Sequence, residues 1–204
     1  MFTGITQGTY EVVSVRHQSD LLTYEVALDS TLVAGLQVGA SVSIDGVCQT
    51  VVSIDGHRVA FDAIRETLEL TTLGSLKLGE KVAVERSARV GDEVGGHDVS
   101  GHVIGRGEVE WVRREGHVCV LAIKVPAFWM KYVLNKGFVA VDGSSLTVCD
   151  ADAKGSFAVH LIPETLRITR LGEKTPGDRL NVELDPRTVA IVDTVERVLT
   201  ERAG

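Results

Sequence analysis

The chain has 204 residues, 44% of them hydrophobic, and a formal net charge of −7. This length allows one ordinary domain or two small ones, with enough apolar residues for a buried core. No window approaches about twenty apolar residues, which excludes a membrane-spanning helix, and no cluster of Lys and Arg favours nucleic acid as a partner. The first residues, MFTGITQGTYEVV, lack a charged region followed by an apolar run, so we expect no signal peptide.

Short alternating or β-branched runs predict strands in the first half at 10–15, 23–28, 41–45, 48–54, 58–62 and 81–85. The same patterns predict strands in the second half at 107–113, 118–125, 138–142, 145–150, 157–161 and 180–184. One short helical candidate lies in each half, at 30–37 and at 126–136, and the segment 88–97 is the expected connection. The sequence is therefore predominantly β.

The last element differs from the rest. From residue 188 to 204 the apolar side chains follow helical spacing, at Ile191, Val192, Val195, Val198 and Leu199. A lone amphipathic helix must bury this stripe against something. Periodicity alone leaves two alternatives open, packing on its own barrel and association with the same helix of other subunits.

The organising feature is an internal repeat. The stretch IDGVCQTV at 44–51 returns as VDGSSLTV at 141–148, and RETLELTTLG at 65–74 returns as PETLRITRLG at 163–172. The chain is therefore read as a tandem duplication. Six short strands per copy predict a small closed β-barrel, because closure removes exposed strand edges. The predicted domains are a first barrel with its linker at 1–97, a second barrel at 98–187 and the helix at 188–204.

The three cysteines indicate the redox environment. Cys48, Cys119 and Cys149 have no CxxC spacing and no histidine at zinc-ligand intervals. Their odd number and wide spacing favour reduced thiols in the cytoplasm, and we expect no metal site.

Several motifs together carry a resemblance to a known family: MFTGI at the N-terminus, GGHDVSGH at 95–102, KGFVAVDGSSLTV at 136–148, HLIPETL at 160–166 and VDTVERVL at 192–199. From residue 1 to about 200 the chain closely resembles riboflavin synthase of the alpha-chain type. The resemblance implies two six-stranded Greek-key barrels and a homotrimer joined by the C-terminal helices. It places the active site between the N-terminal barrel of one subunit and the C-terminal barrel of the next, and it leaves open an association with lumazine synthase.

The resemblance also implies a reaction. Two molecules of 6,7-dimethyl-8-ribityllumazine react, and one donates a four-carbon unit to the other. The products are riboflavin and 5-amino-6-ribitylaminouracil, formed by a transferase without a metal or redox cofactor. A reaction between two copies of one molecule suits a protein with two copies of one pocket, so the differences between the copies indicate where catalysis occurs.

The family's catalytic positions fall on His102, Ser145, Cys48, Thr147 and Asp142 in this sequence. The repeat sets Gly101-His102-Val103 against Gly4-Ile5-Thr6, so the second copy gains an imidazole that can move protons near neutral pH. Cys48 stands where the second copy has Ser145, and its thiol could add to the lumazine or only contact it. Asp142 is matched by Asp45, which also fits a simple turn residue.

The resemblance further implies substrate contacts at Phe2, Gly4, Ile5, Thr6, Cys48, Gln49, Thr50, Asp62, Ala63, Ile64, Arg65, Glu66, Thr67, His97, Gly101, His102, Val103, Lys136, Ser145, Leu146, Thr147, His160, Leu161, Ile162, Pro163, Glu164 and Thr165. Lys136 stands where the first copy has Gly39, so one pocket gains a cation. Gln49 is expected to bring an amide near the first pocket. His97 fits a structural role as well as an active-site role.

Two other functions fit the sequence less well. A non-catalytic lumazine or flavin antenna protein would be expected to lose the second-copy site residues, which this sequence retains. A flavin-binding barrel of an oxidoreductase needs a nicotinamide domain, and no GxGxxG follows a predicted strand.

Overall fold

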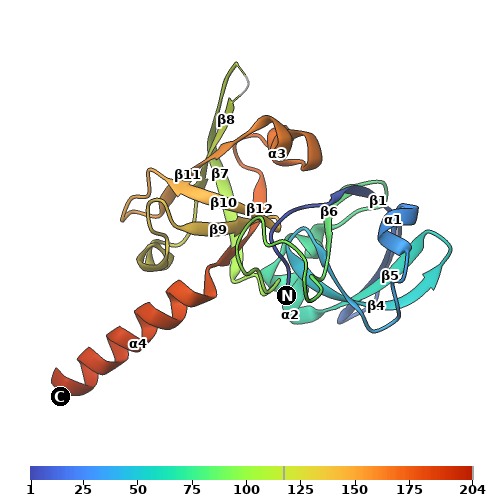
Figure 1. The fold of residues 1–204 in the computed structure, drawn as a ribbon, viewed down its shortest axis with the longest axis horizontal. Coiled ribbons are helices and arrows are strands. Elements are labelled where there is room, and N and C mark those ends of the chain that lie inside the picture. The colour runs from blue at the N-terminus through green and yellow to red at the C-terminus, as the bar shows by residue number, and fades with distance from the viewer. Residues whose placement is uncertain (117, 204) are drawn as a thin grey trace.

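In the computed structural model, which describes residues 1–116 and 118–203, two closed antiparallel barrels lie next to each other and a long helix projects from the second (Figure 1). The first barrel contains β1 (Gly8–His17), β2 (Leu21–Ala27), β3 (Ser41–Ile44), β4 (Val47–Asp55), β5 (Arg58–Ile64) and β6 (Lys81–Arg86). The second contains β7 (Gly105–Glu115), β8 (Val118–Lys124), β9 (Phe138–Val141), β10 (Ser144–Cys149), β11 (Ser156–Leu161) and β12 (Arg179–Leu184). The predicted architecture of two six-stranded barrels with a C-terminal helix is confirmed.

The two barrels repeat each other in detail. The strand order around the first is β1-β2-β5-β4-β3-β6, and the second has the matching order, with β7 in the place of β1. Each first strand also carries a bulge against the second, between Val12 and Ser14 in one copy and between Val109 and Trp111 in the other. The duplication seen in the sequence therefore extends to the irregularities of the strands.

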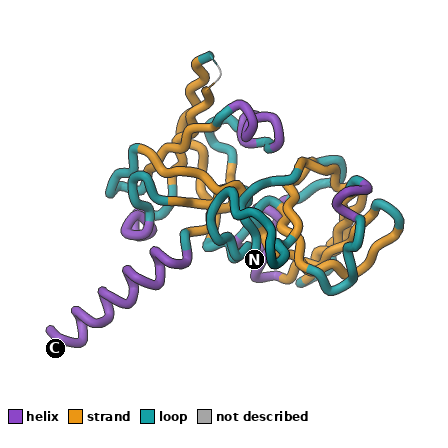
Figure 2. The backbone as a smooth tube through the Cα atoms, viewed as in Figure 1, coloured by secondary structure: helices purple, strands orange, loops and turns teal. Residues whose placement is uncertain are grey.

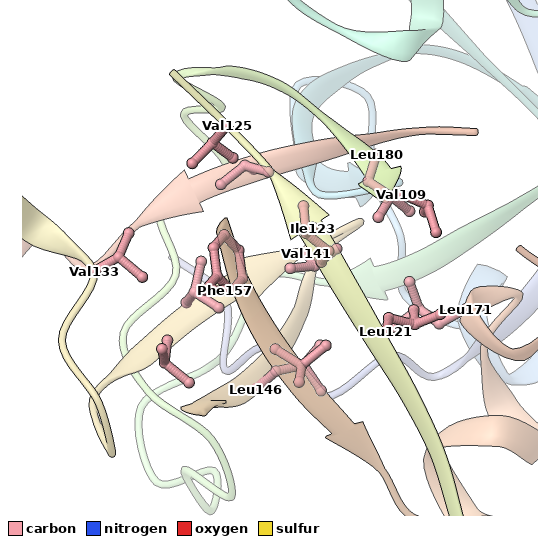
Figure 3. Close-up of a cluster of buried hydrophobic side chains, with 14 of the residues drawn as sticks. Val109, Leu121, Ile123, Val125, Val133, Val141, Leu146, Phe157, Leu171 and Leu180 are labelled. Carbon is pink, nitrogen blue, oxygen red and sulfur yellow. The ribbon is translucent and has the colours of Figure 1, made fainter. Parts of the chain in front are cut away.

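Alternation along the strands builds a separate core in each barrel. Tyr24 and Phe61 fill the first core. Figure 3 shows the second core, which Phe157, Leu121 and Ile123 fill. Each such side chain, when fully buried, contributes about 1.5–3 kcal/mol to folding. The barrels are thus rigid supports for the polar groups at their ends.

The helical turns differ from the expected ones. The turn α1 covers only Ser30–Val33, because Gly35 takes a left-handed conformation (φ 65°) soon after it. The segment expected as a helix at 126–136 contains a 3₁₀-helix, η2 (Ala127–Tyr132). Two unexpected helical turns, α2 (Arg65–Leu70) and α3 (Pro163–Ile168), follow β5 and β11, where loops were expected; the 3₁₀ turns η1 (Thr72–Ser75) and η3 (Leu171–Glu173) come after them.

The C-terminal helix α4 (Pro186–Ala203) begins two residues earlier than expected and extends away from both barrels (Figure 2). At its base, Lys131 and Tyr132 of η2 contact Asp193 (3.4 and 2.5 Å), and Lys131 also pairs with Glu196 (2.5 Å). The polar face of the helix is thus attached to its own barrel. Within the described part of the chain, no helix is both long and apolar enough to span a bilayer.

Candidate active site

The repeated Asp-Gly pairs form tight turns at the junction of the two barrels. Asp45 and Gly46 (φ 45° and 83°) join β3 to β4, and Asp142 and Gly143 (φ 44° and 81°) join β9 to β10. Positive φ at both central residues is the geometry of a type I′ hairpin, which favours Asp-Gly. The turns pack against each other, since a Cβ added to Gly46 would lie 2.5 Å from the amide nitrogen of Gly143.

The segment that precedes the first strand of each barrel, around Gly4 in one copy and Gly101 in the other, contacts the opposite barrel. We call these two stretches the entry segments. The carbonyl of Gly101 accepts a hydrogen bond from the Cys48 N–H (2.9 Å), and the carbonyl of Gly4 accepts one from the Ser145 N–H (2.8 Å). Any Cβ at Gly101 or Gly4 would come within 2.6 Å of Cys48 Cβ or Ser145 Cβ. Phe2 is 1% exposed and forms a bridge with Val99, so the two entry segments also contact each other.

Two buried glutamates anchor these segments. Glu85, near the end of β6, accepts hydrogen bonds from the N–H groups of Thr3 (2.7 Å) and Gly4 (3.1 Å). Glu183 of β12 does the same for Ser100 (2.7 Å) and Gly101 (2.9 Å). Sequence reasoning missed both glutamates, although they occupy matched positions in KVAVERSAR and RLNVELDPR.

This exchange changes the assignment of His102. The repeat alignment placed its imidazole in the second copy's pocket, but the structure places it beside the first copy's Cys48. A cavity of about 290 Å³ is lined by Val47, Cys48, Glu66, Thr67, Leu70, Thr71, Gly101, His102 and Val103. The alignment could not show this, because it records which residues correspond and not which barrel they contact.

Glu66 and Thr67 reach this cavity from the first turn of α2, which starts where β5 ends. Ile64, just before the helix, is 57% exposed, as is its counterpart Ile162 before α3 (61%). Exposed apolar side chains at these matched positions suit contact with a planar ring.

The remaining residues of these two stretches have diverse surroundings. The carboxylate of Asp62 accepts a hydrogen bond from the Thr23 hydroxyl (2.6 Å), and Arg65 pairs with Glu69 (2.7 Å). Ala63 and Leu161 face the barrel interiors. In the second copy His160 is exposed, Pro163 starts α3 and Glu164 pairs with Arg167. Thr165 lies in α3, and its carbonyl accepts a hydrogen bond from the N–H of Thr169, the C-cap residue of that helix (3.1 Å).

Strand alternation decides which side chains of β4 and β10 face outward. Thr50 and Thr147 are exposed, and Cys48 and Ser145 are partly exposed. Gln49 points into the first barrel instead, where its amide oxygen accepts a hydrogen bond from the Tyr24 hydroxyl (3.3 Å). The expected amide near the first pocket is therefore part of the barrel interior, as is Leu146 on the matching strand.

His97 lies with Ser145, against the second barrel. Its Nδ1 is 2.6 Å from the Ser145 hydroxyl, and its ring stacks on Phe138 (5.1 Å between centroids). The residue is 8% exposed, and burial lowers the pKa of the imidazole, which favours its neutral form at pH 7. Among the described residues, none lies within hydrogen-bond reach of the buried Nε2. Gly96 allows this approach, since a Cβ there would lie 2.7 Å from Ser145 Cβ.

On the second copy's side, Thr6 also approaches β10, with its hydroxyl 3.1 Å from that of Ser144. Ile5, the counterpart of His102, is 43% exposed. The imidazole of one entry segment is thus matched by an aliphatic side chain on the other.

Lys136 has a left-handed backbone (φ 65°), as does its counterpart Gly39 (φ 87°). Both N–H groups bind the same carbonyl of the repeat, that of Val148 or Val51 (2.9 and 2.8 Å). A non-glycine residue pays about 1–2 kcal/mol for this conformation. Such a cost is tolerated mainly where the side chain has a function.

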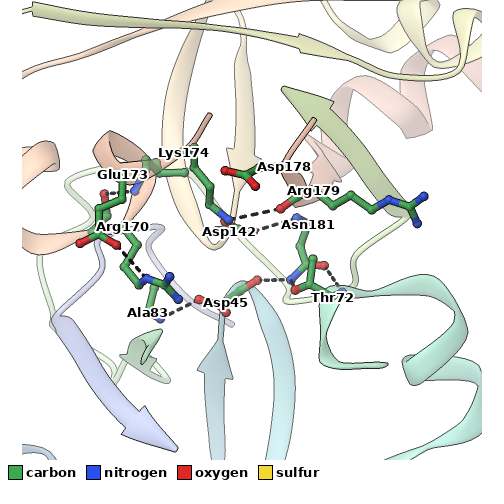
Figure 4. A network of polar contacts seen from close by, with 12 residues as sticks. Asp45, Thr72, Ala83, Asp142, Arg170, Glu173, Lys174, Asp178, Arg179 and Asn181 are labelled. Atoms are coloured by element: carbon green, nitrogen blue, oxygen red, sulfur yellow. Dashed lines mark hydrogen bonds and ion pairs between the residues drawn. The ribbon is translucent and has the colours of Figure 1, made fainter. Parts of the chain in front are cut away.

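Asp142 lies between the barrels (Figure 4). Its carboxylate accepts a hydrogen bond from the Asn181 N–H (2.8 Å) and pairs with Lys174 (3.2 Å). All of these contacts fix the turn and the last strand. Within the described ranges, no group of three or more His, Cys, Asp or Glu side chains is arranged to hold a metal ion.

Known proteins resemble this chain in sequence. The lumazine-binding domain family model matches the chain twice, at residues 3–87 and 100–185. The riboflavin synthase of Escherichia coli (strain K12) is 48% identical over 203 residues, which cover 99% of this chain and 95% of that protein. The riboflavin synthase of Buchnera aphidicola subsp. Schizaphis graminum is 42% identical over 200 residues, with 98% and 96% covered.

Solved structures show the same fold. LumP complexed with riboflavin superposes with a TM-score of 0.84 at 23% identity, covering 91% of this chain and 100% of that one. LumP complexed with 6,7-dimethyl-8-(1'-D-ribityl) lumazine gives a TM-score of 0.80 at 24% identity, with 90% and 98% covered. The two matched domains and the full-length relatives show that this chain belongs to the riboflavin synthase family.

Proposed function

We propose that the chain catalyses the dismutation of 6,7-dimethyl-8-ribityllumazine. Two molecules give one riboflavin and one 5-amino-6-ribitylaminouracil, and the four carbons lost by one reactant are gained by the other. The reaction consumes no electron acceptor. The observation that carries the proposal is the cavity that brings Cys48 of one copy together with His102 of the other.

In this proposal, His102 removes a proton from the acidic methyl group of the lumazine in the Cys48 cavity. A solvent-accessible imidazole at the rim of a cavity suits a proton acceptor that must return its proton each turnover. Cys48 supplies a thiol at the same cavity, either as a nucleophile or as a ring contact. Thr50 and Thr67 offer hydroxyl groups to the polar edge of the ring or to the ribityl chain.

The second lumazine binds at Ser145 and Thr147. His97 accepts or donates the hydrogen bond that orients the Ser145 hydroxyl, because its stacked ring leaves it little freedom to rotate. Lys136 offsets negative charge on the deprotonated intermediate. Holding the two reactants in one orientation supplies up to about 7–11 kcal/mol of the barrier reduction. Asp142 acts on this site through the turn it stabilises.

The proposed assembly is a homotrimer. Ile191, Val195, Val198 and Leu199 are exposed on one face of α4, and the polar contacts of its other face fix its direction. Spacings of three and four residues make this a continuous apolar stripe suited to helix–helix contact. The site then forms between the first barrel of one subunit and the second barrel of the next.

Truncation before Thr188 tests the assembly. We expect the truncated protein to be monomeric by light scattering and inactive, with both barrels still folded. A truncated protein that remains trimeric would place the contacts on the barrels instead.

The free thiols of Cys48, Cys119 and Cys149 fit a reducing compartment, so we place the reaction in the cytoplasm. Association with lumazine synthase, the enzyme class that would supply the substrate, stays a prediction of the family resemblance.

The purified protein should be incubated with 6,7-dimethyl-8-ribityllumazine alone, and absorbance and products followed. Riboflavin and the aminouracil in equal amounts would support the proposal. Tight binding without product would instead indicate a lumazine-binding antenna or storage protein.

A further inference from the structure

A partly buried polar cluster lies where the two barrels meet, away from the Cys48 cavity. We name Asp45, Thr72, Asp142, Arg170, Lys174 and Asn181 the inter-barrel cluster (Figure 4). It encloses the two Asp-Gly turns and is not part of either proposed pocket. Its contacts indicate what it does.

One contact of the cluster is present in both copies of the repeat. The carboxylate of Asp45 accepts a hydrogen bond from the Ala83 N–H of β6 (2.6 Å). The carboxylate of Asp142 accepts one from the Asn181 N–H of β12 (2.8 Å). Each turn is thereby attached to the last strand of its own barrel.

The other contacts of the cluster come from residues that only the second copy has. Asn181, which is 1% exposed, stands where the first copy has Ala83. Its side-chain nitrogen donates to the carbonyl of Asp45 and to the hydroxyl of Thr72 (both 2.8 Å), and its oxygen accepts from the Thr72 N–H (2.8 Å). One side chain of the second barrel therefore satisfies three polar groups of the first.

Arg170 adds a second link from the same side. It stands where the first copy has Thr72, and its guanidinium donates to the carbonyl of Lys81 in the first barrel (2.5 Å). Lys174, in place of Leu76, pairs with Asp142 (3.2 Å) and brings positive charge close to Asp45. The first copy has Ala83, Thr72 and Leu76 at these three positions, so it makes none of these side-chain links in return.

The cluster is close in the chain to both reactive side chains. Cys48 follows Asp45 by three residues, and Ser145 follows Asp142 by three. Each of these residues donates a backbone hydrogen bond to a carbonyl of the opposite copy, so its surroundings depend on how the barrels are placed.

We propose that Asn181 and Arg170 are positioning residues for the reaction. They hold the barrels in the one relative placement at which the segment 101–103 closes the Cys48 cavity and Gly4 meets Ser145. This inference rests on the proposed function. A displacement of about 1 Å in a reactive group can lower a rate on the order of 100-fold, so small rotations between the barrels matter.

The test replaces the second copy's residues by those of the first, as Asn181→Ala with Arg170→Thr. Both substitutes already occupy the matched positions of a folded barrel. We expect kcat to fall by about tenfold while KM stays within about twofold, because each pocket keeps its own side chains. The single variant Asn181→Ala should also have a lower kcat with a nearly unchanged KM. It replaces the double variant in the test if the double variant does not fold.

Ser75→Ala is the matched control. It removes a hydrogen bond to the Thr72 carbonyl (3.0 Å) at the same junction but inside one barrel. We expect its kcat to equal that of the unmodified protein. An unchanged kcat in Asn181→Ala with Arg170→Thr, or an equal fall in the control, would overturn the inference.

Calorimetry separates this inference from the proposed function. We expect the two barrels of the unmodified protein to unfold in one transition and those of the double variant in two. If the unmodified protein made no riboflavin, the proposed function would fail, and this readout would still decide whether the cluster couples the barrels. One transition in both proteins would count against the coupling.

Discussion

The two barrels share their strand order, their first bulge and their Asp-Gly turn, yet they differ at the proposed pockets and where they meet each other. Some interior positions hold the same residue in both copies, as Val51 and Val148 do, and others differ, as Gln49 and Leu146 do. The differences include Cys48 against Ser145, His102 against Ile5, Lys136 against Gly39 and Asn181 against Ala83. The comparison teaches that the duplication produced two barrels of the same fold, and that later substitutions made the residues at their pockets and at their junction different.

The crossing of the entry segments adds a second lesson. The segment before each barrel contacts the other barrel, and the Cys48 cavity accordingly contains residues of both copies. Neither barrel is therefore expected to form a complete pocket by itself.

The largest effect is expected from Gly101→Ala. The new Cβ would lie 2.6 Å from Cys48 Cβ and 2.8 Å from its nitrogen, so the segment must move away. We expect turnover to fall by at least about 100-fold in a steady-state riboflavin assay. Gly177→Ala is the control, because it has the same left-handed strain (φ 92°) with nothing within 4 Å. Equal losses of turnover in both variants would show that strain, and not the crossing, limits activity.

A smaller effect is expected from Cys48→Ser, which makes the first turn resemble the second. The hydroxyl keeps the shape but not the thiolate chemistry, so turnover should fall by about tenfold, or roughly 1.4 kcal/mol of barrier. Lumazine affinity, measured by fluorescence titration, should change less. Cys149→Ser on β10 is the control, with no expected loss. An unchanged rate in Cys48→Ser would remove the thiol from the mechanism.

Lys136→Gly restores the residue of the first copy and should separate activity from stability. We expect turnover to fall about fivefold, since roughly 1 kcal/mol of electrostatic stabilisation is lost. The free energy of unfolding should rise by up to about 1 kcal/mol, because relief of the left-handed strain exceeds the added chain entropy. Denaturant titration checks this expectation. A less stable and fully active variant would contradict the role proposed for the cation.

The smallest effect is on stability alone and comes from Asp45. Burial between the barrels, with the nearby charge of Asp142, raises its pKa to about 7, against the opposing effects of the Ala83 N–H, Lys174 and Arg170. A carboxyl with a raised pKa stabilises the fold while protonated, and this contribution is lost as pH rises from about 4 to about 7.

Asp45→Asn keeps an acceptor for the Ala83 N–H but cannot ionise. The difference in Tm between this variant and the unmodified protein should therefore grow in favour of the variant from pH 5 to pH 8. Groups that titrate in both proteins, such as His97, contribute equally to both Tm values and drop out of the difference. A pH-independent difference would mean that Asp45 stays ionised throughout.

Much of the fold could be predicted because strand alternation and the repeat reinforce each other. The six-residue turns α2 and α3 could not, since RETLEL and PETLRI are too short to show a helical period. The exchange of entry segments was also hidden, because the alignment of Gly4 with Gly101 is the same whichever barrel each one contacts. The matched Gly39 did reveal the unusual position of Lys136, whose left-handed backbone only the structure displays.

The central claim is that one reaction needs two unlike pockets, one from each copy and from neighbouring subunits. Complementation between Gly4→Ala and Gly101→Ala tests it most directly, because each substitution damages a different pocket. Each variant should be nearly inactive alone. After unfolding and refolding together in equal amounts, about a quarter of subunit interfaces would join two intact pockets. We predict recovery of about that fraction of the original activity, whereas a mixture no more active than its parents would contradict the claim.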